Sequence, residues 1–127
     1  MGYSCGIDIV EVQRVQDNLT GSAADKFREL IYTSKECDIC ESRGVTRFQS
    51  YAGRFAAKEA FAKALGSGLT EQVRMDEIEV MQDENGKPFL VCHGITKETV
   101  REKGIREIEV SISHTAALAT AVVILSK

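Results

Sequence analysis

The chain has 127 residues, of which 28% are charged and 43% hydrophobic, and its net charge at pH 7 is -3. This length fits one domain over residues 1–127, and no apolar run reaches the length of a membrane-spanning helix. The N-terminus lacks the basic flank and long apolar core of a signal peptide, so we expect a cytoplasmic protein. A slightly acidic chain gives no general case for nucleic-acid binding.

A short apolar run over residues 3–10 has the β-rich composition of a buried strand. Asp8 interrupts this run between two isoleucines. Residues 10–19 then place apolar side chains at helical spacing, so we expect Asp8 near a strand-to-helix junction. Two interpretations stay open: Asp8 caps the following helix, or it belongs to a functional site.

Two short helices are expected between residues 23 and 40. Thr33 and Glu36 have the spacing of a capping box, which gives Glu36 a structural explanation. Cys37 and Cys40 have C-x-x-C spacing, but no second such pair accompanies them. We interpret these thiols as reduced and partly buried rather than as zinc ligands.

A long helix is predicted over residues 48–65, closed by glycines. At 100° per residue, Glu59 falls on a stripe of alanine and aromatic side chains. A carboxylate there is costly to bury unless a cation meets it. Either Glu59 pairs with Lys63 one turn later, or it forms a metal site with Asp8, since Mg²⁺ needs few protein ligands.

Basic residues concentrate between residues 43 and 70, where Glu59 is the only acid. This basic block suits an anionic ligand such as a phosphate, or an acidic partner. The alternative is a solvated helix face balanced by acids elsewhere. The basic block consists of Arg43, Arg47, Arg54, Lys58 and Lys63.

The second half of the chain alternates with period two, which is typical of strands. Residues 76–81 and 89–92 predict a hairpin, because Asn85 and Gly86 between them are a strong turn signal. A helix over 95–103 and strands over 107–113 and 118–125 complete the pattern, the last strand being central because it is apolar on both faces. The result is an α+β fold: an antiparallel sheet with one long helix packed across it.

Ser111 and Ser113 share one face of a predicted strand, and His114 follows at its end. Adjacent strand residues point to opposite faces, so the spacing does not indicate a Ser/His/Asp triad. These residues are either ordinary hydroxyls on a half-exposed strand, or donors at a sheet rim suited to a phosphate or nucleobase. His93 has no such company, and we interpret it as a surface residue.

Four stretches occur in a fixed order: GIDIVE at 6–11, AGRFAAKEAFAKALGSG at 52–68, NGKP at 85–88 and VSISHT at 110–115. Together they resemble holo-[acyl-carrier-protein] synthase, the short type of 4′-phosphopantetheinyl transferase, over essentially the whole chain. The resemblance implies that the phosphopantetheine arm of coenzyme A is transferred to a serine of an acidic apo acyl carrier protein, in fatty acid biosynthesis. Adenosine 3′,5′-bisphosphate would leave, and the chain would form a homotrimer with sites at subunit interfaces.

The resemblance also implies individual roles. Asp8 and Glu59 would hold Mg²⁺ and Lys63 would reach the phosphates, while water activated by the metal near Asp8 or Glu36 would act as the base. Asp8, Glu36, Glu59 and Lys63 are thus the expected catalytic residues. Arg54 and Lys58 are candidates for phosphate or carrier contact, and Arg14, with Lys26 and Arg28, is a candidate for carrier contact. Coenzyme A contacts are expected from Arg54, Lys63, Asn85, Gly86, Lys87, Pro88, Ser113, His114 and Thr115, with residues 85–88 approaching from a neighbouring subunit.

Two other classes of function remain open. A non-catalytic module that binds nucleotides or an acidic partner is favoured if Asp8 and Glu59 lie further apart than one ion bridges, about 6 Å. A redox protein would use Cys37 and Cys40 instead.

Overall fold

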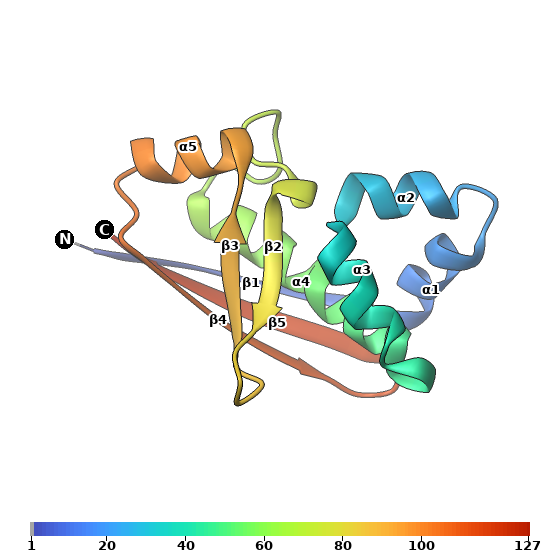
Figure 1. The fold of residues 1–127 in the computed structure, drawn as a ribbon. Helices are drawn as coiled ribbons and strands as arrows, with labels where there is room; N and C mark the ends of the chain where they lie inside the picture. The colour runs from blue at the N-terminus through green and yellow to red at the C-terminus, as the bar shows by residue number, and fades with distance from the viewer. Residues whose placement is uncertain (1) are drawn as a thin grey trace.

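The structure is a computed structural model that describes residues 2–127. Its centre is a three-stranded antiparallel sheet of order β1–β5–β4, formed by β1 (Tyr3–Glu11), β5 (Leu118–Ser126) and β4 (Glu107–His114). One long helix, α4 (Arg47–Leu65), lies across one face of this sheet (Figure 1). The predicted α+β fold, with one long helix packed on an antiparallel sheet, is confirmed.

The other elements surround α4. A hairpin of β2 (Ile78–Gln82) and β3 (Pro88–Cys92) forms a second, two-stranded sheet that the sequence does not separate from the first. Two turns of 3-10 helix, η1 (Gly44–Thr46) and η2 (Met75–Glu77), lead into α4 and β2. Three short helices gather at one end of α4 and a fourth lies at the other (Figure 1): α1 (Val12–Thr20), α2 (Ala24–Ile31), α3 (Ser34–Glu41) and α5 (Gly94–Glu102).

Small side chains allow α4 to lie close to the sheet. Ala52, Ala56 and Ala60 on its inner face are all fully buried. Gly6 of β1 lies directly against the helix, since a Cβ there would sit 2.0 Å from the carbonyl oxygen of Ala60. Asp8 is two residues further along β1 and therefore faces the same helix.

Asp8 lies within β1 and not at its end. It pairs with Ala121 of β5, and the strand continues to Glu11. Glu11 is the N-cap of α1 and makes no side-chain capping bond. The interpretation of Asp8 as an N-cap is therefore wrong, because the strand runs on past it.

The face of the three-stranded sheet that points away from α4 is apolar. Ile7 and Ile9 of β1 are 66% and 64% exposed in the single chain, and Leu118 and Ile124 of β5 are 40% and 44% exposed. The strand β5 is central, as predicted, but its outer face has no cover within residues 2–127. A contiguous apolar face of this kind marks an interaction surface.

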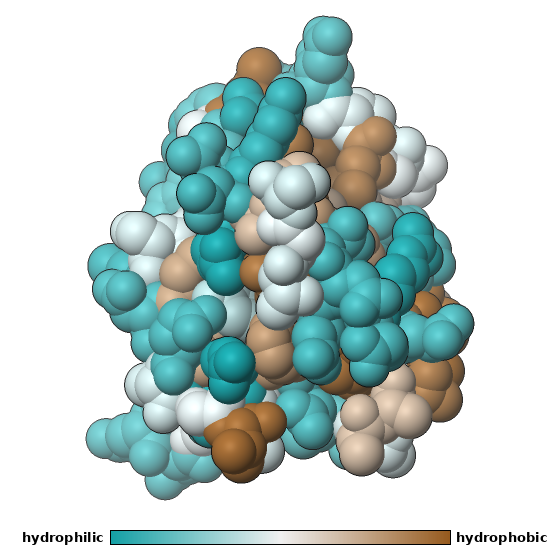
Figure 2. Space-filling model, turned by 90° about the vertical axis from the view of Figure 1, so that its right-hand side faces the viewer, coloured by the Kyte–Doolittle hydropathy of each residue, from teal (hydrophilic) through white to brown (hydrophobic). Residues whose placement is uncertain are grey.

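The end of the molecule formed by α1, α2 and α3 is a different surface. Figure 2 views the molecule from this side and shows hydrophilic residues over most of it, with apolar residues in separate spots. Scattered apolar residues on a polar surface are normal. In the part of the chain that the structure describes, no helix is both long enough and apolar enough to cross a membrane.

Candidate active site

Three charged side chains meet where β1 packs against the C-terminal half of α4. The Lys63 ammonium donates to Asp8 Oδ1 at 3.0 Å and to the carbonyl oxygen of Ile7 at 3.1 Å. The Asp8 side chain is mostly buried and that of Lys63 is half exposed. Lys63 thus makes its ion pair with a carboxylate on another element and not with Glu59, four residues before it.

Glu59 lies close to this ion pair. Burial raises its pKa, and the negative charge of Asp8 raises it further, while Lys63 and Arg14 act in the opposite direction. Asp8 is therefore close enough for its negative charge to act on Glu59. The structure therefore brings together Asp8, Glu59 and Lys63, which are distant along the sequence.

The donor set of this carboxylate pair fits a hard divalent cation. Residues 2–127 hold no group of three or more acidic, histidine or cysteine side chains arranged to ligate a metal. Mg²⁺ does not need such a group, because it keeps several waters and takes one or two carboxylates together with substrate phosphates. Asp8 and Glu59 offer two oxygen-donor groups, and their mutual repulsion is relieved when a cation lies between them.

A second feature lies on the other half of α4, and we call it the nucleotide cavity after the ligand that the sequence resemblance implies. It has a volume of about 200 Å³ and is enclosed by α4, the tip of the β2–β3 hairpin and the end of β4. Its lining combines two arginines, an imidazole and polar groups, and includes Arg43, Ser50, Arg54, Gly86, Pro88 and His114. Three of the four sequence stretches that carry the resemblance thus meet in one cavity.

Arg54 is the most unusual residue of the nucleotide cavity. It is only 5% exposed, and Nη1 donates to Ser50 Oγ at 2.7 Å. Its Nε and Nη2 atoms are buried and have no hydrogen-bond partner among residues 2–127. Sequence reasoning does not single out Ser50, although its position one helical turn before Arg54 is a signal that identifies it.

The residues at the C-terminal end of β4 divide between the two faces of the sheet. His114 lines the nucleotide cavity, whereas Ser113 is exposed on the opposite face of β4. The Thr115 hydroxyl accepts hydrogen bonds from two backbone amides of the turn that follows. The structure therefore brings only His114 of these three side chains to the cavity.

The hairpin turn also contributes unequally. Gly86 and Pro88 line the cavity, and Gly86 has the positive φ of 82° that a tight turn requires. The Asp83 carboxylate holds the turn by accepting from the backbone amides of Asn85 and Lys87. The Lys87 side chain points elsewhere and forms an ion pair with Glu109 at 3.4 Å.

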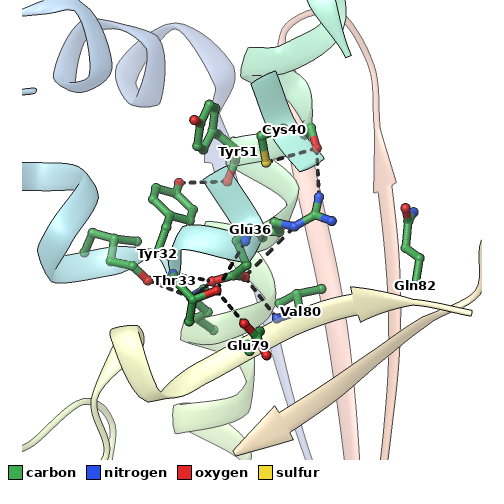
Figure 3. Close-up of polar contacts among 12 residues, drawn as sticks. Tyr32, Thr33, Glu36, Cys40, Tyr51, Glu79, Val80 and Gln82 are labelled. Carbon is green, nitrogen blue, oxygen red and sulfur yellow. Dashed lines mark hydrogen bonds and ion pairs between the residues drawn. The ribbon is translucent and has the colours of Figure 1, made fainter. Parts of the chain in front are cut away.

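Glu36 lies in the core. Its Oε1 accepts from Lys58 Nζ at 2.6 Å and from the Thr33 amide at 3.0 Å, and its Oε2 accepts from the Val80 amide at 2.9 Å (Figure 3). The capping box at Thr33 is confirmed. Glu36 is not among the charges that act on Glu59, so the structure does not bring this carboxylate to the carboxylate pair.

Lys58 is fully buried as well. Its ammonium donates to Glu36 and to the carbonyl oxygens of Ile31 at 2.7 Å and Met75 at 2.9 Å. All three of its donors therefore have partners inside the protein. The expectation that Lys58 contacts a phosphate or the carrier is wrong, because its charge faces the core and not the surface.

His93 and Glu79 form a pair that the sequence does not predict. Glu79 is 6% exposed, although the alternating pattern of its strand places it on the polar face. It accepts from the Thr33 hydroxyl at 2.6 Å and lies 3.1 Å from His93 Nε2. His93 is an exposed residue, as interpreted from the sequence, but it has a partner that the sequence does not predict.

The four cysteines are free thiols. Burial is the largest cause that raises the pKa of Cys37 and of Cys40. Buried thiols with a raised pKa form little of the thiolate that redox chemistry needs. The structure gives no support to a redox function for this pair.

Comparison with known proteins adds the family to this geometry. The family model of the 4′-phosphopantetheinyl transferase superfamily matches residues 4–121. The holo-[acyl-carrier-protein] synthase of Ruminiclostridium cellulolyticum is 41% identical over 121 residues, which cover 95% of this chain and 90% of that protein.

Solved structures agree with the sequence comparison. The holo-[acyl-carrier-protein] synthase of Helicobacter pylori, solved in complex with coenzyme A, has a TM-score of 0.84 and 31% identity, covering 96% of this chain and 99% of that one. The Bacillus anthracis synthase, in complex with CoA (3′,5′-ADP), has a TM-score of 0.78 and 36% identity, covering 96% of this chain and 94% of that one. The chain therefore belongs to the 4′-phosphopantetheinyl transferase superfamily and, within it, to the holo-[acyl-carrier-protein] synthases.

Proposed function

We propose that this chain transfers the 4′-phosphopantetheine arm of coenzyme A to a serine of an apo acyl carrier protein, with Mg²⁺ as cofactor. The products are the holo carrier protein and adenosine 3′,5′-bisphosphate. The observation that carries the proposal is the convergence of Asp8 and Glu59 from separate elements, with Lys63 beside them. Relatives whose solved structures contain coenzyme A support the choice of donor.

Asp8 and Glu59 are the residues that would hold Mg²⁺. When bound, the ion neutralises charge on the diphosphate of coenzyme A and on the departing phosphate. Lys63 lies next to Asp8 with a half-exposed side chain, so its ammonium can also donate to a phosphate oxygen. Lys63 would stabilise the negative charge that grows as the diphosphate bond breaks, and Asp8 and Glu59 would act by holding the ion.

The nucleotide cavity is the proposed site for the adenosine bisphosphate part of coenzyme A. Arg54 brings a buried positive charge with two unpaired nitrogens, which suits a phosphate. His114 offers an imidazole, and Gly86 and Pro88 offer backbone and apolar surface for a base. We carry Asn85, Lys87, Ser113 and Thr115 forward as contacts that require a neighbouring subunit, since their side chains do not line this cavity.

We propose that the chain assembles into a homotrimer. The apolar outer face of the three-stranded sheet, which includes Ile7, Ile9, Leu118 and Ile124, supplies surface for such an assembly. In such a trimer, we expect one coenzyme A to contact the carboxylate pair of one subunit and the nucleotide cavity of its neighbour. Size-exclusion chromatography with light scattering tests this, and a monomer that retains full activity contradicts it.

The proposed partner is an acidic carrier protein. Arg14 on α1 lies close enough for its charge to act on Glu59, so a carrier bound there would present its serine near the carboxylate pair. Lys26 of α2 is a further basic residue on this side, whereas Arg28 already bonds to Asp25 and to the Leu19 carbonyl oxygen. A cytoplasmic site of action fits the four free thiols.

Mass spectrometry tests the proposed transfer directly. An apo acyl carrier protein incubated with this protein, coenzyme A and Mg²⁺ should gain the mass of one phosphopantetheine, and EDTA should abolish the gain. The Asp8→Ala and Glu59→Ala variants should lose the gain, while Glu71→Ala, at an exposed acid outside the site, should keep it.

Two outcomes would contradict this assignment. Undiminished transfer by both site variants would show that the carboxylates have no role in the reaction. Tight binding of coenzyme A or of the carrier without any mass gain would favour a non-catalytic binding module.

A further inference from the structure

Three charged side chains share the core between α3, α4 and β2. Glu36 and Lys58 form a fully buried ion pair at 2.6 Å. Arg54 is one helical turn before Lys58, and its Nε lies 4.0 Å from Glu36 Oε2. Two cations thus compete for one carboxylate in a region from which water is excluded.

The contacts show which cation holds Glu36. Lys58 donates to it directly, and two backbone carbonyl oxygens, from Ile31 and Met75, fix the ammonium in that position. Arg54 makes no hydrogen bond to Glu36, and its one bonded nitrogen, Nη1, reaches Ser50. The carboxylate is therefore committed to Lys58, and the three side chains together retain one positive charge at Arg54.

Because Glu36 is buried, its pairing with Lys58 determines what Arg54 can bind. A buried carboxylate without a cation is strongly unfavourable, so Glu36 must have a partner. An arginine can form a bidentate, charge-assisted pair with a carboxylate, and this pair is stronger than the hydrogen bonds that arginine makes with water. Without Lys58, a shift of about 1 Å would bring Arg54 into hydrogen-bond range of Glu36, since such bonds are near 2.9 Å.

We propose that Lys58 is a positioning residue for ligand binding: by occupying Glu36, it leaves the Arg54 guanidinium free to bind a phosphate group in the nucleotide cavity. Lys58 itself contacts no ligand, because all three of its donors are used inside the protein. Arg54 lines the nucleotide cavity, and its buried Nη2 has no hydrogen-bond or ion-pair partner among residues 2–127, which suits an anion. This inference rests on the proposed function, since coenzyme A supplies the phosphate.

Isothermal titration of the full chain with coenzyme A tests the inference. Lys58→Met should raise the Kd about tenfold or more, because Arg54 turns to Glu36. The double variant Glu36→Gln with Lys58→Met removes both charges and should restore the Kd to within about threefold of the parent. In steady-state kinetics, Lys58→Met should raise KM for coenzyme A while kcat at saturation is retained.

Two controls separate positioning from general damage. Lys35→Met removes the same charge from an exposed residue next to Glu36 and should leave the Kd unchanged. In an Arg54→Gln background, Lys58→Met should add no further loss of affinity, because the effect passes through Arg54.

Each outcome bears on the proposal. A folded Lys58→Met variant that binds coenzyme A as tightly as the parent overturns it. If that variant does not fold, the double variant decides: affinity more than about tenfold weaker than that of the parent overturns the inference, and parent-like affinity supports it. Failure of the parent chain itself to bind coenzyme A would instead contradict the proposed function.

Discussion

Lys58 and Glu59 are neighbours on α4 but belong to two very different regions. Lys58 enters the buried cluster with Glu36, where every donor has a partner at 2.6–2.9 Å. Glu59 lies near Asp8 of β1, where burial and the charge of Asp8 raise its pKa against the opposite effects of Lys63 and Arg14, and its side chain has no hydrogen-bond partner among residues 2–127. In the first region each charge is balanced by partners within the protein. In the second region the carboxylates keep excess negative charge that a bound cation would balance.

This difference separates structural from functional charge. A buried ion pair with complete hydrogen bonding holds elements together, and in this fold it joins α3, α4 and β2. A partly buried pair of like charges destabilises the free protein and gains most from a bound cation. Substitutions in the two regions should therefore affect stability and activity in opposite proportions.

The largest expected effect on stability is at Glu36. Glu36→Ala leaves the Lys58 ammonium without its counter-ion and opens the cap of α3, so the free energy of unfolding should fall by about 3–5 kcal/mol. Urea denaturation followed by circular dichroism measures this loss. Asp38→Ala, at an exposed acid of the same helix, is the control and should cost about 0.5 kcal/mol or less. Equal losses at the two sites would contradict the comparison.

The largest expected effect on activity is at Glu59. Glu59→Gln keeps the shape of the side chain but removes its charge, so carrier modification should slow by more than about 100-fold, as expected for loss of a metal ligand. The melting temperature should stay the same or rise, because the repulsion from Asp8 disappears. A large loss of stability without loss of activity would show that the two regions have been assigned the wrong way round.

The contact between Gly6 and α4 should have a smaller effect on both properties. In Gly6→Ala, the new Cβ would lie 2.0 Å from the Ala60 carbonyl oxygen and 2.7 Å from the Ala64 amide nitrogen, both of them backbone atoms. The helix must move away, which should cost about 1–3 kcal/mol of stability. It also moves Glu59 relative to Asp8, so activity should fall in the folded protein. Gly2→Ala, where a Cβ meets nothing within 4 Å, is the matched control.

Much of this fold could be predicted because its patterns are local. The capping box at Thr33, the turn at Gly86 and the alternation of the strand that contains Val110 each depend on neighbouring residues, and each is present in the structure. The division of the sheet into two could not be predicted, since it depends on which strands pair at long range.

The sequence predicts which residues form the candidate site, but it does not predict which of them pair with one another. The sequence identifies Asp8, Glu59 and Lys63 as charges in apolar surroundings, yet helical spacing pairs Lys63 with Glu59, whereas Lys63 bonds to Asp8 on β1. The same limit applies to Lys58, whose basic neighbours suggest a surface role. A side chain of this length can point to the core or to the ligand, and only the packed structure decides between them.

The smallest expected effect is the acid sensitivity of the pair formed by Glu79 and His93. Burial alone would raise the pKa of Glu79, but hydrogen bonds from Thr33 and His93 outweigh it and hold the pKa below its usual value of 4.5. A carboxylate with a lowered pKa in the folded state stabilises the protein above its unfolded pKa, and this contribution is lost as the pH falls through the folded value. Glu79→Gln should therefore lower the melting temperature slightly at neutral pH and should make its decline below about pH 4.5 shallower than in the parent.

Thermal melts of both proteins between about pH 3 and pH 7 measure this difference. Glu84→Gln is the control and should leave the acid dependence unchanged, because this exposed side chain in the hairpin turn makes no hydrogen bond or ion pair with residues 2–127. Parallel melting curves for the parent and the Glu79 variant would show that the hydrogen bonds to this carboxylate persist after protonation.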